Sequence, residues 1–204
     1  MDHFVQHATR SLPENYVLRV RFSARDQRTM LAINAAGFVL LFLFGWLFIV
    51  AALWLRPEDT TAVLSSNWGG WKPLAAIIGV LLLSGITIYL HEAIHGLGFW
   101  LATRTRPVFG MRSVYAYAAA PEWYIPRDPY LLIGLAPLLS ISIIGIFLIA
   151  FVPGMLIGPI LVVLVMNASG AVGDLWVAVL LLRQPADALA CDSGEEVRIY
   201  APHR

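Results

Sequence analysis

The sequence predicts an all-α integral membrane protein with four transmembrane helices and, between the second and third, a loop able to form a short β-hairpin. Two observations lead to this fold class. Of the 204 residues, 59% are hydrophobic and only 13% are charged, whereas a typical soluble domain has about 25% charged residues. Four apolar stretches are also long enough to cross a bilayer, which takes about 20 helical residues.

The four predicted spans cover residues 31–55, 73–101, 130–152 and 155–182. The first has no charged residue, and no cleavable signal precedes it, so it is predicted to be a retained helix. Only Pro153 and Gly154 separate the last two spans, which are therefore predicted to form a tight antiparallel pair. No internal repeat or second domain is apparent, and residues 1–204 are predicted to form a single membrane-embedded domain.

Basic residues determine the predicted orientation, because cytoplasmic loops carry an excess of Lys and Arg. Only Arg56 and Lys72 flank the connection between the first two spans. Twelve others lie in the segments predicted to share the opposite side. Both the N-terminal segment 1–30 and the tail 183–204 are therefore predicted to be cytoplasmic. The twelve are Arg10, Arg19, Arg21, Arg25, Arg28, Arg104, Arg106, Arg112, Arg127, Arg183, Arg198 and Arg204.

The loop at residues 107–127 differs in composition from the spans. Its segment VYAYA, from Val114 to Ala118, alternates and is rich in strand-forming residues, while Gly110 and Pro121 indicate turns. Two interpretations remain open at this point. In the first, the loop forms a short hairpin or strand that lies at the cytoplasmic surface or dips into it. In the second, it is an ordinary interfacial loop with an aromatic belt.

The second predicted span carries three ionisable residues, in LSGITIYLHEAIHGLGFW at residues 83–100. On a helix, His91 and His95 are one turn apart and project from one face, so both imidazoles can reach one cation. Glu92 lies beside them, where its carboxylate can take a proton from an activated water. Ionisable residues inside a span cost about 2.5–3.5 kcal/mol on insertion scales and mark functional sites. Metal binding would offset that cost, and we predict a metal site with Glu92 as its catalytic residue.

The structural alternative is a polar cluster that hydrogen-bonds helices together without a metal. His3 and His7 have the same spacing as the predicted ligands, but no Glu lies between them and they stand in a polar terminus. That pair is interpreted as incidental, and so is His203.

A catalytic zinc site usually has three protein ligands and a water molecule, so two histidines leave it incomplete. Asp174 is the only other carboxylate well inside a predicted span. From the helical rise, Asp174 and the histidine pair both lie about 12 Å from the cytoplasmic ends of their spans. We predict one Zn²⁺ per chain, bound by His91, His95 and Asp174. The competing carboxylates, interpreted as solvated charges in loops, are Asp128, Asp192 and Glu122.

Asn167 precedes Asp174 by seven residues, nearly two turns, and is predicted to lie on the same helix face about 10 Å deeper. There it could hydrogen-bond the substrate backbone or the oxyanion. Gly170 and Gly173, between the two, would let another helix approach closely. The alternative for all three residues Asn167, Gly170 and Gly173 is simple helix packing by small and polar side chains.

These motifs resemble known membrane metallopeptidases. A membrane-embedded HEAIH helix followed two spans later by an aspartate is similar to the layout of site-2 intramembrane metalloproteases. The chain resembles more closely a zincin-type membrane metallopeptidase family, a domain of unknown function found mostly in bacteria. The specific matches are HEAIHGLGF and NASGAVGDLW; LPENYV, the tyrosine-alanine loop, LIGLAPLL and LLRQPADALACDSGEEVRIY add to them.

The resemblance implies that His91, His95 and Asp174 bind zinc and that Glu92 is the general base. It also implies a bacterial-type plasma membrane as the location. Site-2 proteases normally have a glycine after the metal-binding aspartate and a proline close before it. Here Leu175 follows the aspartate, and the proline of this span stands near its start. The difference concerns substrate handling more than metal binding.

The predicted activity is that of a membrane-embedded zinc metalloprotease of the HExxH type, which hydrolyses peptide bonds of membrane or membrane-proximal proteins. A substrate must be extended locally, and Val114, Tyr115, Ala116 and Tyr117 could pair with it as an added strand. The expected partners are the lipid bilayer and a membrane-protein or peptide substrate. No nucleic acid is expected, because the Arg residues gather beside the apolar runs and do not form a basic face. The single cysteine excludes an internal disulfide framework. The alternative is a non-hydrolytic zinc-binding membrane protein: a sensor, carrier or scaffold.

Overall fold

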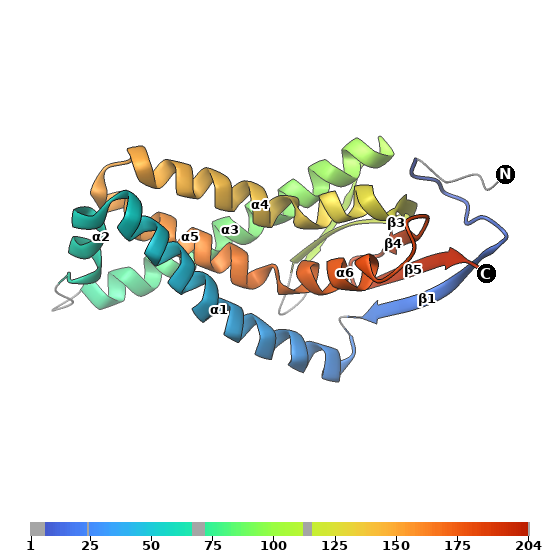
Figure 1. Ribbon diagram of the computed structural model, residues 1–204, viewed down its shortest axis with the longest axis horizontal. Coiled ribbons are helices and arrows are strands. Elements are labelled where there is room, and N and C mark those ends of the chain that lie inside the picture. The colour runs from blue at the N-terminus through green and yellow to red at the C-terminus, as the bar shows by residue number, and fades with distance from the viewer. Residues whose placement is uncertain (1–6, 24, 67–71, 112–115, 204) are drawn as a thin grey trace. The chain divides into compact units, whose positions relative to one another are not determined.

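The computed structural model describes residues 7–23, 25–66, 72–111 and 116–203. The chain forms two compact units: unit 1 combines Met1–Asn34, Glu92–Pro137 and Gly173–Arg204, and unit 2 combines Ala35–His91 and Leu138–Val172. The elements in chain order (Figure 1) are β1 (Tyr16–Ser23), α1 (Gln27–Leu55), α2 (Pro57–Leu64), α3 (Lys72–Thr103), β2 (Val108–Met111), β3 (Ala116–Pro126), α4 (Arg127–Phe151), the 3-10 helix η1 (Gly154–Leu156), α5 (Ile157–Gly170), α6 (Val172–Leu182), β4 (Leu189–Asp192) and β5 (Glu196–Pro202).

Unit 1 contains an antiparallel sheet of five strands in the order β1-β5-β4-β3-β2 (Figure 1). The prediction of an all-α fold is therefore wrong. Strands β1, β4 and β5 come from the N-terminal segment and the tail, which hydropathy alone treats as polar flanks. Their sequences do carry a strand signal. In β1, YVLRVRFS, the side chains of Val20 and Phe22 pack against the core, while Arg19 and Arg21 are exposed, as expected for a strand with one buried face.

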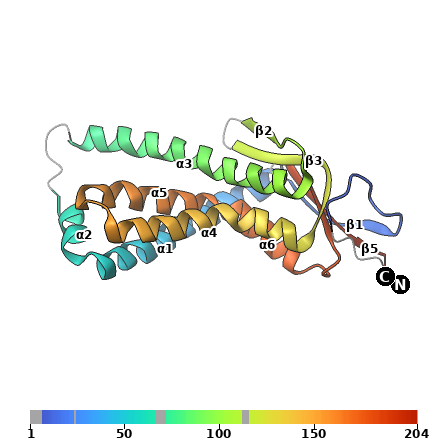
Figure 2. The ribbon, with the colours of Figure 1, turned by 90° about the horizontal axis from the view of Figure 1, so that it is seen from above.

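The loop after α3 contains the antiparallel strand pair β2 and β3, which confirms the predicted hairpin; its place at the cytoplasmic surface stays a prediction. Strand β2 pairs with β3 in the register Gly110↔Tyr117 and Met111↔Ala116. On its other side β3 pairs with β4, so β2 is the edge strand of the sheet. In Figure 2 the hairpin lies beside the C-terminal part of α3.

The core of unit 1 lies where helix side chains meet the sheet. Phe99 of α3, Tyr130 of α4 and Leu181 of α6 are buried in one cluster with Ile199 of β5 and several alanines of β3 and β4. Burying a large apolar side chain contributes roughly 1.5–3 kcal/mol. The small alanines leave room for the larger helix residues. This cluster holds the C-terminal part of α3, the start of α4 and α6 against the sheet.

Three helices, α1, α3 and α4, are long and apolar enough to cross a membrane. They correspond to the first three predicted spans. Much of their apolar surface is exposed: Trp54 is 88% exposed, Phe38 63% and Leu81 68%. A water-soluble fold would not leave such long apolar faces open, because apolar patches of this extent mark contact with lipid or protein.

The prediction of a fourth continuous span is wrong. Residues 154–182 form η1, α5 and α6, and the axes of α5 and α6 are bent by 42° at a break around Ala171. Together they pass the length and hydropathy test only as a bent pair. Glycines on both sides of the break, Gly170 and Gly173, have low helix propensity. Ser169 adds to the bend because its Oγ donates to the carbonyl of Val165 at 2.7 Å, and such back-bonding distorts helices.

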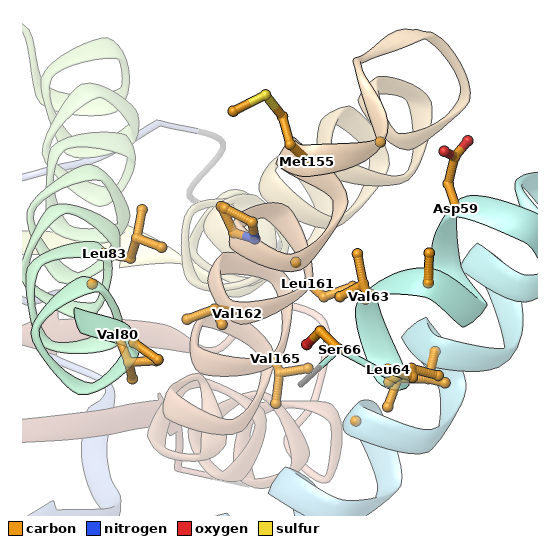
Figure 3. Close-up of a pocket in the computed structure, with 18 of the residues that line it drawn as sticks. Asp59, Val63, Leu64, Ser66, Val80, Leu83, Met155, Leu161, Val162 and Val165 are labelled. Carbon is orange, nitrogen blue, oxygen red and sulfur yellow. The ribbon is translucent and has the colours of Figure 1, made fainter. Parts of the chain in front are cut away.

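Unit 2 contains an apolar cavity of about 1150 Å³, lined mainly by helices α2, α3 and α5 (Figure 3). Val80 and Leu83 of α3 line one side and Val162 of α5 the other. Among the described residues that line it, only Asp59 and Ser66 have polar side chains. Figure 2 shows the N-terminal half of α3 standing apart from α5. The low polarity of the lining suits this space to apolar groups and not to ions.

Candidate metal centre

Helix α3 carries the first three candidate residues in its C-terminal half. The helix is continuous through His91, Glu92 and His95, so the two histidines stand one turn apart on one face, as predicted from their spacing. His95 is buried, with 7% of its surface exposed, while His91 and Glu92 are half-buried.

The imidazole of His95 is held by two other elements of unit 1. Its Nδ1 lies 3.0 Å from the carbonyl oxygen of Ile133 in α4. A carbonyl can only accept, so Nδ1 carries the hydrogen and donates it. The other ring nitrogen, Nε2, lies 3.4 Å from Oδ1 of Asp174. A ring with one hydrogen on Nδ1 faces the carboxylate with a lone pair, and this arrangement is favourable only with a cation between them, either a proton on Nε2 or a metal ion.

Asp174 reaches this position because of the break between α5 and α6. It stands in the first turn of α6, where the helix dipole and the unpaired backbone N–H groups stabilise a negative charge. Its side chain is 26% exposed. Two of the three competing carboxylates are exposed, with the side chains of Glu122 and Asp128 exposed to 74% and 68%. They do not lie in loops as predicted, because Glu122 belongs to β3 and Asp128 to the first turn of α4.

His91 has a different support, in unit 2. Its Nδ1 lies 2.9 Å from Oδ1 of Asn167, and Asn167 is only 2% exposed. The amide oxygen also only accepts, so His91 again donates from Nδ1. The prediction that Asn167 shares a helix face with Asp174 assumed one straight span. Because the helix is broken at Ala171, Asn167 belongs to α5 and directs its oxygen to His91.

One potential ligand atom from each of His91, His95 and Asp174 lies within 4.8 Å of the other two. Two imidazole nitrogens and a carboxylate oxygen are ligands that zinc accepts, and a catalytic zinc site typically has three such ligands. Ligating histidines almost always donate their other N–H to a carbonyl or carboxylate, and both histidines do so here. The residues present therefore fit a zinc ion.

Residues 84–189 match the model of the family described as "Putative zincin peptidase". The chain belongs to this zincin peptidase family. The match confirms the resemblance inferred from the sequence and identifies the chain as a member of a metallopeptidase family, with zinc as the implied metal. The matched region contains the HEAIH segment as well as Asn167 and Asp174. Comparison with curated proteins and with solved structures gives no match.

The interpretation of Asp192 as a solvated charge in a loop is wrong. Asp192 is the last residue of β4, and its Oδ2 accepts a hydrogen bond of 2.6 Å from the phenol of Tyr130 in α4. Its Oδ1 accepts from the backbone N–H of Gly194 at 2.7 Å. Burial raises the pKa of Asp192, although both hydrogen bonds act in the opposite direction. The signal in the sequence was CDSGEEVRIY, a turn before an alternating strand.

The residues predicted to pair with a substrate lie partly in the hairpin. Val114 and Tyr115 lie outside the described residues. Ala116 and Tyr117 belong to β3, where they pair with Met111 and Gly110 of β2; β4 pairs with β3 farther along, at Ala120, Ile125 and Pro126. In the strand order, β2 is the last strand on this side of the sheet. Its residue Phe109 packs onto Gly96 of α3, directly after His95, at a distance that leaves no room for a Cβ atom.

Proposed function

We propose that this chain is a membrane-embedded zinc peptidase with one Zn²⁺ bound by His91, His95 and Asp174. One observation carries the proposal: both histidines of the HEAIH segment donate from Nδ1 to a fixed oxygen, with Nε2 of His95 3.4 Å from the Asp174 carboxylate. Histidines that bind a metal through Nε2 typically donate a hydrogen bond from Nδ1 to an oxygen in this way. A cluster that only joined helices would not need two histidines in the same tautomer.

Glu92 is the proposed catalytic residue. It follows His91 on α3, where the spacing of the HExxH motif gives the carboxylate the role of general base. A bound zinc ion supplies a Lewis acid that polarises the scissile carbonyl and lowers the pKa of water toward about 7. Glu92 accepts the proton of the attacking water and passes it to the leaving amine. The predicted contact of Asn167 with substrate or oxyanion stays a prediction, separate from its hydrogen bond with His91.

The proposed substrate is a membrane or membrane-proximal protein, locally extended along the β-hairpin. The pairing strand is better assigned to β2 than to residues 114–117, because β2 is the sheet edge and its Phe109 contacts the helix next to His95. An edge strand presents unpaired N–H and C=O groups to an added strand. Gly96→Ala should displace Phe109 and slow cleavage while zinc binding is kept. Gly85→Ala is the control, since a Cβ there meets nothing within 4 Å; equal cleavage by both variants would remove β2 from the proposal.

The proposed location is a bacterial-type plasma membrane, with both termini in the cytoplasm, which requires the bent pair of α5 and α6 to cross the membrane together as one broken span beside α1, α3 and α4. The exposed apolar helices α1, α3 and α4 support embedding in a bilayer, and the basic flanks support this orientation. Reporter fusions at Arg204 and after Thr60 should report opposite sides, with Arg204 cytoplasmic. Both fusions on one side would contradict the topology.

The alternative is a zinc-binding membrane protein that does not hydrolyse peptides, such as a sensor, carrier or scaffold. Glu92 distinguishes the two functions. A binding site alone has no need for a carboxylate that lies beside the histidines without serving as a ligand, whereas hydrolysis needs a base in that place.

The deciding experiment compares wild-type protein with Glu92→Gln and His95→Ala in zinc content and in cleavage of a co-expressed membrane substrate. Glu92→Gln should keep about one zinc per chain and lose cleavage by roughly 10²–10⁴-fold, the usual contribution of general acid–base catalysis. His95→Ala should lose both. Glu122→Gln, which changes an exposed glutamate of β3, is the control. Wild-type protein without zinc, or undiminished cleavage by Glu92→Gln, would overturn the proposal.

A further inference from the structure

The hydrogen bond between His95 and Ile133 depends on an unusual feature of helix α4. In a regular α-helix the carbonyl oxygen of residue 133 accepts from the backbone N–H of residue 137. Here residue 137 is proline, well inside α4 (Arg127–Phe151). Proline has no N–H, and its ring crowds the carbonyl four residues earlier. The Ile133 carbonyl therefore cannot make its usual intrahelical bond with residue 137.

His95 supplies the hydrogen that Pro137 cannot. Its Nδ1 lies 3.0 Å from the Ile133 oxygen, in a buried environment. A buried carbonyl without a partner is unfavourable, and so is a buried imidazole N–H without an acceptor. The contact satisfies both groups, and because the acceptor belongs to the backbone, its position is determined by the helix and not by a side-chain rotamer.

Two further contacts bring α4 to the right place for this hydrogen bond. Gly98 of α3 lies against Ile133, with its hypothetical Cβ only 3.0 Å from the Ile133 side chain, so the helices approach closely one turn from His95. One turn before Ile133, Tyr130 is fixed by its hydrogen bond to Asp192 and by its edge-to-face contact with Phe99. The carbonyl of Ile133 is thus held on both sides.

We infer that Pro137 is a positioning residue of the metal centre: by leaving the Ile133 carbonyl open to His95, it fixes the imidazole with its hydrogen on Nδ1 and Nε2 toward the metal. This inference rests on the proposed zinc site. It assigns a purpose to a proline that otherwise only weakens a helix, since proline in a helix interior is strongly unfavourable. Pro137 contacts neither the metal nor the substrate and acts through Ile133 and His95.

The test is Pro137→Ala in the full chain, purified in detergent or nanodiscs. Alanine restores an N–H at position 137, which competes with His95 for the Ile133 carbonyl and lets α4 straighten. The zinc affinity, measured by competition with a chelator, should fall about 10–100-fold, as is usual when a partner of a ligating histidine is changed. The absorption spectrum of the cobalt-substituted protein should change as well, because it reports ligand geometry, which a merely structural proline would not affect.

Pro159→Ala is the matched control. Pro159 stands in the first turn of α5, where an N–H has no intrahelical acceptor in any case, so zinc affinity and cobalt spectrum should stay as in wild type. Equal zinc affinity and an unchanged spectrum in Pro137→Ala would overturn the inference while leaving the zinc site intact. Wild-type protein that binds no zinc would instead overturn the proposed function.

A second measurement covers the case in which Pro137→Ala does not fold. Histidine-selective ¹⁵N labelling of the zinc-loaded wild type, with His3, His7 and His203 replaced by Gln, leaves signals from the two site histidines. Both should show a hydrogen on Nδ1 and the metal on Nε2. Zinc bound through Nδ1 of either histidine would overturn the inference.

Discussion

The two histidines of the HEAIH segment are held in different ways. His95 donates to a backbone carbonyl, is buried, and belongs to the sheet-containing unit 1. His91 donates to a side-chain amide, is half-buried, and belongs to the helical unit 2. A backbone acceptor cannot be removed by substituting its own residue, whereas a side-chain acceptor can. The two supports should therefore respond to different substitutions, although both histidines face the same proposed ion.

The largest loss of zinc affinity is expected when one of the three proposed zinc ligands is removed. Asp174→Ala removes the carboxylate that faces Nε2 of His95, and the zinc affinity should fall by more than the roughly 10–100-fold typical of changes around the ligands. Zinc content after dialysis against a weak chelator measures it. Asp128→Ala, which removes an exposed carboxylate, should bind zinc like wild type. Full zinc content in Asp174→Ala would assign the third ligand to another residue.

The support of His91 can be removed and then restored. Asn167→Ala deletes the acceptor of the His91 Nδ1 hydrogen, which should weaken zinc binding about 10–100-fold. Asn167→Asp keeps an acceptor of the same size and adds a charge, so zinc affinity should return close to that of wild type in isothermal titration. If the two variants bind zinc equally well, the side-chain support of His91 has no role in the site.

A smaller effect is expected from the contact that fixes α4 near His95. Tyr130→Phe removes the 2.6 Å hydrogen bond to Asp192, and hydrogen bonds to charged groups contribute about 1.5–3 kcal/mol. The free energy of unfolding should fall by about that amount, and the zinc affinity should fall modestly. Tyr16→Phe also removes a tyrosine hydrogen bond, to the Asp187 carbonyl, and should lower stability without changing zinc affinity. The same zinc affinity in both variants would separate Tyr130 from the support of His95.

The strands were harder to predict from the sequence than the helices. The long apolar runs predicted the first three helical spans because a membrane span leaves a signal some 20 residues long. Strands β1, β4 and β5 have four to eight residues each and need partners far away in the chain. The turn at residues 193–195 and the alternation in EVRIYAP indicate that β4 and β5 pair with each other, but nothing local indicates that β5 also pairs with β1 and β4 with β3.

The sequence by itself determined the spacing of His91, Glu92 and His95, because residues one turn apart on a helix share a face whatever surrounds the helix. It also singled out Asp174, since a carboxylate inside an apolar run is costly without a function. Tertiary structure alone decided which atoms support the ligands. Pro137 marks the Ile133 carbonyl as one without its usual intrahelical partner, but only the packing of α4 against α3 brings that carbonyl to His95. Asp192 meets Tyr130 only when β4 packs beside α4. The break at Ala171, too, is a balance between weak helix formers and packing, and it is this break that directs Asp174 to His95 and Asn167 to His91.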